Sequence, residues 1–97
     1  MNSLHNIIET INISKFLSFE HVYLFGSILK PDAHPNDIDI LVIYKKYSTQ
    51  VSKDINLLSD IITHKCGLPV DLTALSFEEE KEVCFVNKIK DICVKLK

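Results

Sequence analysis

Hydrophobic positions along the chain recur at two spacings, one typical of helices and one typical of buried strands. Near the N-terminus, apolar residues recur at helical spacing over residues 4–17, which predicts a first helix capped by Ser3. A second helix is predicted over residues 50–65, where apolar side chains again fall on one face. Gly67 and Pro69 follow and are expected to end it.

Three short apolar runs predict strands. The first covers residues 21–25 and ends at Gly26, the second covers residues 38–44, and the third covers residues 70–75. The second run is apolar at nearly every position. This is typical of a strand that is covered on both faces and lies at the centre of its sheet.

The last part of the chain predicts one more helix. Ser76 can cap it, and Glu79, three residues further on, completes a capping box. An apolar stripe along this helix is expected from Phe85, Ile89, Ile92, Cys93 and Leu96. The predicted order is therefore α-β-β-α-β-α over a single domain of residues 1–97, an α/β (α+β) fold in which helices pack against a small mixed sheet.

Composition and charge exclude several classes of function. The 97 residues are enough for one domain with a modest core. The net charge of −2 argues against a general nucleic-acid-binding surface. Every basic residue except histidine is Lys, so phosphates must be held by backbone amides, lysines or metal ions. Neither a leader pattern nor a long apolar run is found, which predicts a soluble cytoplasmic protein without a membrane association.

The three cysteines do not suggest a metal site or a disulfide framework. Cys66, Cys84 and Cys93 are odd in number and show no CxxC spacing, so reduced thiols packed mostly as small apolar groups are expected. His64 and Cys66 could form half of a metal site, but the sequence offers no second pair at ligand spacing.

Two carboxylates at the start of the second predicted strand are the first sign of chemistry. Asp37 and Asp39 project from the same face of that strand, about 6.6 Å apart at Cα. Such a pair can bind one divalent ion or two neighbouring ions, and without a cation the two charges repel each other. Asp71 begins the third predicted strand. If that strand lies beside the second, it completes a three-carboxylate cluster.

A Gly-Ser pair at the end of the first predicted strand suggests a phosphate contact. Gly26 lets a phosphate approach the backbone closely, the amides that follow can hold its oxygens, and the Ser27 hydroxyl can donate one more hydrogen bond. A phosphate cradle, two metal-binding carboxylates and a third that could activate an attacking hydroxyl suit nucleotidyl transfer with two metals.

This arrangement resembles the signature of the DNA-polymerase-β-like nucleotidyltransferases. The matching residues are Gly26 and Ser27, the Asp-Ile-Asp of residues 37–39 before an apolar run, and Asp71 on a later strand. The small size is similar to the minimal nucleotidyltransferase branch. The resemblance implies that Gly26 and Ser27 bind the nucleotide triphosphate, and that Lys30 replaces the Arg usual after the pair as a phosphate contact.

The same resemblance implies cofactors and a partner. Asp37 and Asp39 are expected to bind Mg²⁺, with two ions, and Asp71 to assist metal binding and deprotonation. Members of this branch are often encoded beside a HEPN-domain protein and act as antitoxins that transfer AMP from ATP to a tyrosine of that toxin. The protein is therefore expected to work with a HEPN-type partner in a hetero-oligomer, without binding nucleic acid directly.

Two other interpretations stay open at this point. The Arg-free segment that follows Ser27 is compatible with an inactive nucleotidyltransferase fold that acts as an antitoxin or assembly subunit by binding alone. Alternatively, the protein is a nucleotidyltransferase that modifies RNA or a small molecule together with a separate binding subunit. The main interpretation rests on a chain with little room for a substrate-binding domain, so that a partner protein presents the acceptor hydroxyl.

Overall fold

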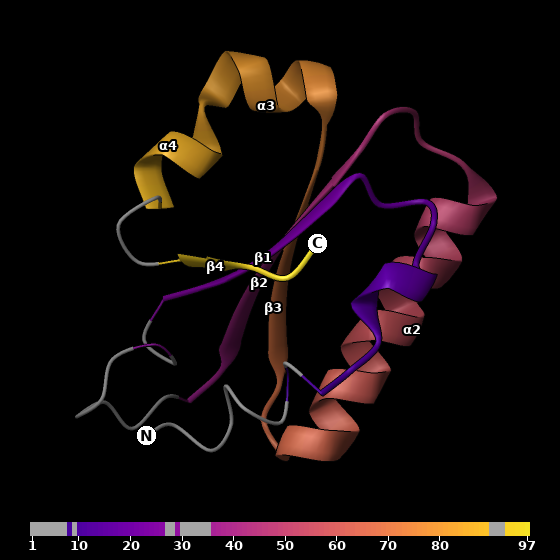
Figure 1. Cartoon of the computed structure of the whole chain (residues 1–97), viewed down its shortest axis with the longest axis vertical. Helices are drawn as coiled ribbons and strands as arrows, with labels where there is room; N and C mark the ends of the chain where they lie inside the picture. The colour runs from indigo at the N-terminus through magenta and orange to yellow at the C-terminus, as the bar shows by residue number, and fades with distance from the viewer. Residues whose placement is uncertain (1–7, 9, 27–28, 30–35, 90–92) are drawn as a thin grey trace.

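A four-stranded mixed sheet forms the centre of the computed structural model, which describes residues 8, 10–26, 29, 36–89 and 93–97 (Figure 1). Its strands are β1 (His21–Phe25), β2 (Ile38–Tyr44), β3 (Val70–Ser76) and β4 (Cys93–Lys95), in the spatial order β3-β2-β1-β4. β1 pairs antiparallel with both β2 and β4, whereas β2 and β3 are parallel. The predicted mixed sheet is thus confirmed, with β2 in an interior position.

The parallel pair β2 and β3 requires a crossover, and helix α2 (Thr49–Cys66) provides it. The Ser48 side chain caps its start by accepting a hydrogen bond from the backbone N–H of Val51 at 3.2 Å. Gly67 ends the helix in the left-handed conformation, and its N–H donates to the carbonyl of Thr63 at 2.8 Å. The predicted helix over residues 50–65 and its stop at Gly67 are confirmed.

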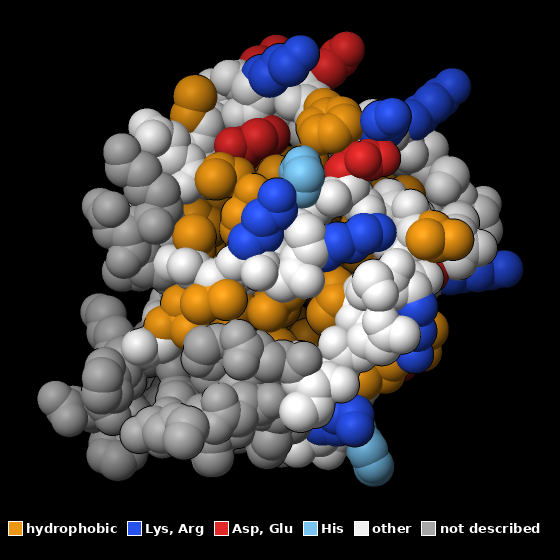
Figure 2. Space-filling model, in the orientation of Figure 1, with side chains coloured by type: hydrophobic (Ala, Val, Ile, Leu, Met, Phe, Trp, Pro, Cys, Tyr) orange, Lys and Arg blue, Asp and Glu red, His pale blue; other side chains and the backbone are white. Residues whose placement is uncertain are grey.

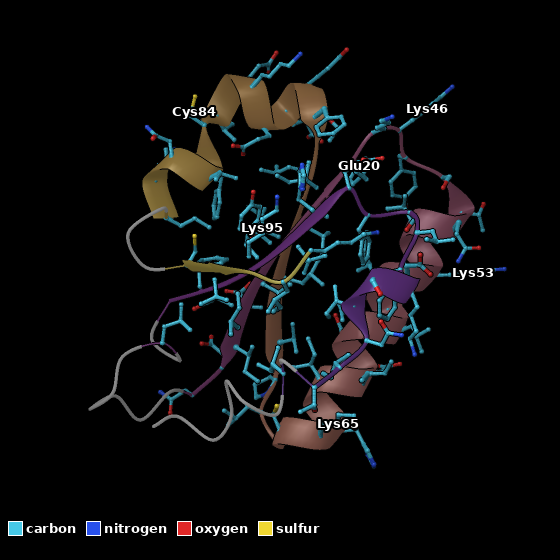
Figure 3. All side chains as sticks on the ribbon, viewed as in Figure 1. Glu20, Lys46, Lys53, Lys65, Cys84 and Lys95 are labelled. Atoms are coloured by element: carbon cyan, nitrogen blue, oxygen red, sulfur yellow. The ribbon has the colours of Figure 1, made fainter. Side chains whose placement is uncertain are left out.

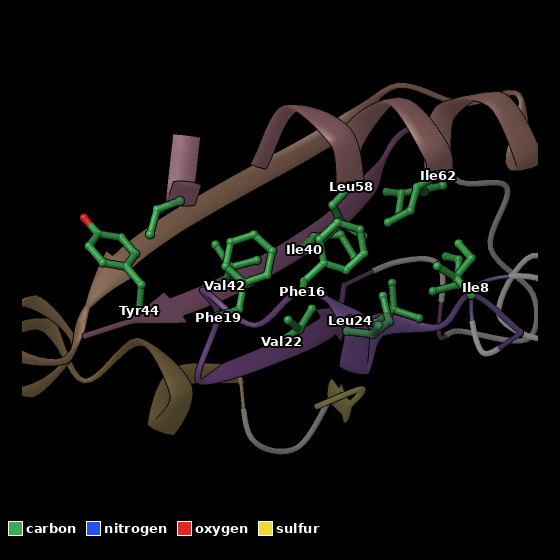
Figure 4. Packing of buried hydrophobic residues seen from close by; sticks show 14 residues of the cluster. Ile8, Phe16, Phe19, Val22, Leu24, Ile40, Val42, Tyr44, Leu58 and Ile62 are labelled. Atoms are coloured by element: carbon green, nitrogen blue, oxygen red, sulfur yellow. The ribbon is translucent and has the colours of Figure 1, made fainter. Parts of the chain in front are cut away.

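The face of the sheet that α2 covers, called here the closed face, holds most of the core. Phe16 and Phe19, from the segment before β1, are 1% exposed and lie between the sheet and α2 (Figure 4). Strands β1 and β2 and helix α2 contribute further buried members, which include Val22, Leu24, Ile38, Ile40, Val42, Leu58 and Ile62. Burial of these side chains is the main favourable contribution to folding.

The opposite face, called here the open face, carries the strand side chains that alternate with those of the closed face. It is covered at one end of the sheet by two short helices, α3 (Phe77–Val83) and α4 (Phe85–Ile89) (Figure 1). Its buried cluster is small, and several of its apolar side chains are only half-buried: Tyr23, Phe25, Leu75, Phe77, Phe85, Val86 and Cys93. Hydrophobic side chains accordingly reach the surface between α4 and β4 (Figure 2).

The predicted first helix over residues 4–17 is wrong in its second half. Residues 4–7 and 9 lie outside the described residues, and the segment from residue 10 onward contains a single 3₁₀ turn, η1 (Ile13–Lys15). The Ser14 hydroxyl donates to the Asn12 side chain at 2.6 Å, a local polar contact of the kind that competes with helix formation. The chain then turns so that Phe16 and Phe19 both enter the core.

The predicted last helix begins as expected but does not continue. The capping box is confirmed: the Glu79 N–H donates to the Ser76 hydroxyl at 3.1 Å, and the Ser76 N–H donates to the Glu79 carboxylate at 2.9 Å. Cys84 then adopts the left-handed conformation, with φ 51°, and ends α3. The Glu80 carboxylate accepts the N–H of Phe85 at 3.0 Å and starts α4 in a new direction.

Strand β4 takes the place of the expected C-terminal end of that helix. Cys93 lies in β4 opposite Phe25, and Leu96 follows the strand and packs against the closed-face core. Ile92, the remaining residue of the expected stripe, lies outside the described residues. The residues of the expected stripe are therefore shared between α4 and β4, and the backbone of β4 makes its hydrogen bonds to β1 instead of within a helix.

None of the helices in the described part of the chain combines the length and apolar character needed to cross a membrane.

Candidate active site

Three carboxylates meet at one end of the sheet. Asp39 and Asp71 are register partners in the parallel pair β2 and β3, and Asp37 lies directly before β2. One carboxylate oxygen of each residue lies within 4.8 Å of one from the other two. Asp37 and Asp39 are half-buried and Asp71 is exposed. The structure thus brings together all three predicted acidic residues, close enough to share a divalent cation.

Gly26 lies directly against this acidic cluster. It ends β1 with a φ of 87°, a conformation that favours glycine, and its carbonyl accepts the N–H of Leu29 at 3.1 Å. A Cβ at this position would overlap the Asp39 carboxylate oxygen and lie 3.1 Å from its Cγ. The Asp39 carboxylate therefore occupies the space that a side chain at residue 26 would need, and Gly26 lies beside the acidic cluster at this end of the sheet.

The electrostatics of the cluster favour a bound cation. Burial raises the pKa of Asp39 above its ordinary value, and the neighbouring charges of Asp37 and Asp71 raise it further. A divalent cation would reverse the effect of the neighbouring charges, because it attracts the ionised form of each carboxylate. Carboxylate oxygens are the ligands that Mg²⁺ prefers, so these three residues fit that ion.

The other predicted nucleotide contacts cannot be placed. Ser27 and Lys30 both lie outside the described residues, so their assignment stays a prediction.

Two surface hollows in the described part of the chain lie away from the carboxylates, one beside η1 and β4 and one where α3 meets α4. The triad is thus identified by its chemistry and not by the depth of a pocket.

The row of side chains that contains Asp39 continues across the sheet. Phe25 is the register partner of Asp39 on β1, and Cys93 is the partner of Phe25 on β4, so the row reads Asp71, Asp39, Phe25, Cys93. The ring of Phe25 lies 5.5 Å from that of Phe85, nearly perpendicular to it at 75°. This row was not predicted from the sequence, because residues 93–95 were expected to be helical.

The next row of the open face adds polar groups beside the aromatic pair. It contains Tyr23, with Lys95 as its partner on β4 and Leu41 as its partner on β2. Burial raises the pKa of the Tyr23 hydroxyl, and the neighbouring Cys93 and Glu80 raise it further. Lys95 is exposed and labelled in Figure 3.

The three cysteines have different environments. Cys66 packs against the closed-face core, and burial raises the pKa of its thiol. Cys93 packs against the open-face cluster. Cys84 is exposed, and its thiol donates to the carbonyl of Lys81 at 3.6 Å. Two of the three thus pack as small apolar groups, as expected.

Comparison with known proteins identifies the family of the chain. The family model of the polymerase beta nucleotidyltransferases matches residues 5–96. The chain belongs to the polymerase beta nucleotidyltransferase family. The expected nucleotidyltransferase fold is thereby confirmed, and the resemblance noted in the residues around Gly26 and Asp37 reflects family membership. A search of curated proteins found no match.

Two solved structures are similar to the chain. One is a chain of the complex between the tri-AMPylated HEPN toxin and the MNT antitoxin of Shewanella oneidensis, with 21% identity, a TM-score of 0.54, and coverage of 95% of this chain and 71% of that chain. The other is a candidate nucleotidyltransferase from Sulfolobus solfataricus, with 28% identity, a TM-score of 0.47, and coverage of 98% and 78%. At 21% identity the first likeness supports the shared fold.

Proposed function

We propose that this nucleotidyltransferase transfers AMP from ATP, with Mg²⁺ bound, to a hydroxyl group of a partner protein, and that it acts in this way as the antitoxin of a HEPN-type toxin. The meeting of Asp37, Asp39 and Asp71 beside Gly26 is the observation on which the proposal rests. Family membership supports nucleotidyl transfer as the reaction class. The toxin complex among the similar structures supports a protein as the acceptor.

The proposed roles follow from position in the site. Asp37 and Asp39 would hold the metal ions, because their carboxylates are half-buried and lie close together at the start of β2. When bound, the ions would stabilise the negative charge that develops on the transferred phosphoryl group and on the pyrophosphate, which leaves as the acceptor oxygen bonds to the α-phosphorus. Asp71 is exposed, so it can reach the hydroxyl of an acceptor presented from outside and take up its proton. Gly26 leaves room for the Asp39 carboxylate beside the backbone, which keeps the proposed triphosphate position next to the metal ligands. Ser27 and Lys30 would add further contacts to the triphosphate.

Presentation of the acceptor by another protein agrees with the charge of the molecule. The net charge is −2 and no arginine is present, which disfavours the phosphate backbone of RNA as the regular substrate. A protein hydroxyl carries no such charge and requires only access to Asp71.

The test combines the protein with the product of the neighbouring gene, ATP and Mg²⁺, followed by measurement of intact mass. A gain of one AMP unit or more on the partner is expected, and none with the double variant Asp37→Asn, Asp39→Asn. Neutralisation of the partner by this variant as effectively as by the unmodified protein would instead favour action by binding alone. Incorporation of labelled nucleotide into RNA or a small molecule, with no gain on the partner, would overturn the choice of acceptor.

A further inference from the structure

An aromatic pair, Phe25 and Phe85, lies beside the acidic triad on the open face. Phe25 and Asp39 are register partners on neighbouring strands, so their side chains point to the same side of the sheet from backbones about 4.8 Å apart. Asp71 extends the same row on the other side of Asp39. The aromatic ring closest to the triad in this row therefore belongs to Phe25.

The pair is held in place from two elements and keeps part of its surface accessible. Phe85 opens α4, and its N–H donates to the Glu80 carboxylate at 3.0 Å, which fixes the start of that helix. The two rings pack edge to face at 5.5 Å, a favoured aromatic geometry. Both are half-buried, whereas Phe16 and Phe19 on the closed face are 1% exposed.

The direction of the proposed reaction indicates which part of a substrate would meet this pair. In an in-line transfer, the attacking oxygen and the leaving group lie on opposite sides of the phosphorus. The proposed function places the triphosphate beside Gly26 at the end of β1 and the acceptor beside Asp71 on β3. The sugar and base must therefore extend away from both of these residues. The sugar and base then extend over the open face, along which the next side chains are Phe25, Tyr23 and Leu41.

We propose that Phe25 and Phe85 form the platform on which the adenine ring of ATP packs. This inference depends on the proposed function and specifies how its nucleotide is held. A flat, uncharged ring suits an aromatic surface, because base–aromatic stacking does not require a charged partner. The triad and Gly26 would hold the triphosphate, and the aromatic pair would hold the base, so that the two halves of the nucleotide use separate parts of one face.

The inference is tested by comparing two ligands that differ only in the presence of sugar and base. Calorimetry measures the affinity of MgATP and of Mg-tripolyphosphate for the unmodified protein and for the variants Phe25→Leu and Phe85→Leu. MgATP is expected to bind each variant about tenfold more weakly, as loss of one stacking contact implies. Mg-tripolyphosphate is expected to bind all three proteins equally.

A matched control separates binding of the base from loss of stability. Phe16→Leu makes the same chemical change on the closed face, where no ligand is proposed, and should leave both affinities unchanged. Unaltered MgATP affinity in folded Phe25→Leu and Phe85→Leu variants overturns the inference. A loss that is equal for MgATP and Mg-tripolyphosphate also overturns it, because the platform would then not act on the base.

If either variant fails to fold, a second measurement on the unmodified protein tests whether adenine packs on the two rings. In the unmodified protein with bound MgATP, nuclear Overhauser effects are expected between the adenine H2 or H8 protons and phenylalanine ring protons. Their absence overturns the inference even if ATP binds. ATP binding with these contacts, but without transfer to the partner, would leave the platform standing and overturn the proposed acceptor. Failure of the unmodified protein to bind MgATP would overturn both.

Discussion

The two faces of the sheet differ in how their side chains are covered and in which residues they carry. On the closed face, strands β1 and β2 present apolar side chains that α2 and the segment before β1 bury almost completely. On the open face, the same two strands present Asp39, Phe25 and Tyr23, all half-buried. Because successive residues of a strand alternate between the faces, one stretch of sequence contributes to the core and to the candidate active site at once.

The closed face and the open face are expected to contribute differently to stability and to function. The closed face supplies most of the hydrophobic stabilisation, so substitutions there should reduce the free energy of unfolding. The open face carries three carboxylates within 4.8 Å of each other, whose mutual repulsion lowers stability as long as no cation is bound. Substitutions on the closed face should therefore mainly lower stability, whereas substitutions on the open face should mainly alter binding to the candidate active site.

The largest effect on stability is expected from the closed face. Leu24 on β1 is fully buried, whereas Leu75 on β3 is half-buried on the open face. Leu24→Ala should lower the free energy of unfolding by about 2–5 kcal/mol, since it removes buried methyl groups and leaves a cavity. Leu75→Ala, the same change on the open face, should cost clearly less. Urea denaturation followed by circular dichroism measures both, and equal losses would contradict the division between the faces.

Gly26 ends β1 and also lies against Asp39 in the candidate active site. Its substitution should therefore lower both the stability of the protein and its affinity for Mg²⁺. In Gly26→Ala, the new Cβ would overlap the Asp39 carboxylate, in a backbone conformation with φ 87°. The expected loss is about 1–3 kcal/mol in the free energy of unfolding, together with weaker Mg²⁺ binding, because Asp39 must move. Gly67→Ala is a matched control with φ 74° but no atom within 4 Å of the added Cβ. It should lose stability through strain alone and retain Mg²⁺ binding.

The elements with the clearest local signals could be predicted from the sequence. β2 is a continuous apolar run, and α2 has a helical repeat followed by a clear stop at Gly67. The carboxylates at 37 and 39 needed only the two-residue repeat of a strand to be placed on one face. The closeness of Asp71 followed from a parallel pairing that the sequence allowed but did not require. β4 was missed because Cys93 and Leu96 also fit a helical stripe, and only pairing with β1 decides between the two.

The aromatic pair on the open face shows a similar limit. Phe25 and Phe85 are 60 positions apart in the sequence, and each fits an apolar pattern of its own element. Their contact depends on the break at Cys84, where a non-glycine residue adopts the left-handed conformation, and on the Glu80 carboxylate that starts α4. Neither has a strong sequence signal, since a single glutamate in an acidic helix is more simply explained by the helix dipole.

A smaller effect, opposite in sign, is expected at Asp39. Its raised pKa means that the folded state disfavours the ionised carboxylate, so Asp39 lowers stability above its folded pKa and ceases to do so below its unfolded pKa. Asp39→Asn should therefore raise the melting temperature at pH 7 without Mg²⁺, and the gain should vanish under strongly acidic conditions. Asp60→Asn, an exposed carboxylate on α2, is the control and should change little.

Mg²⁺ should reverse the ranking of these two proteins. An ion that binds only the folded state raises the melting temperature, so the unmodified protein should be stabilised by Mg²⁺ at pH 7 while Asp39→Asn responds much less. Thermal melts with and without Mg²⁺ measure this directly. A melting temperature of the unmodified protein that does not respond to Mg²⁺, together with no gain in Asp39→Asn, would show that the triad neither repels internally nor binds the ion.

The smallest effect is expected at the capping box of α3, the helix that borders the open face. Hydrogen bonds from the backbone and the side chain of Ser76 lower the pKa of Glu79 below its ordinary value of 4.5. The ionised carboxylate thus contributes stability above the unfolded pKa, and this contribution disappears as the pH falls through the lower folded pKa. Glu79→Gln should slightly lower the melting temperature at pH 7 and match the unmodified protein at low pH. Glu78→Gln, on the same helix turn, should show no such pH dependence. A Glu79→Gln deficit that persists in acid would assign the effect to the shape of the cap and not to its charge.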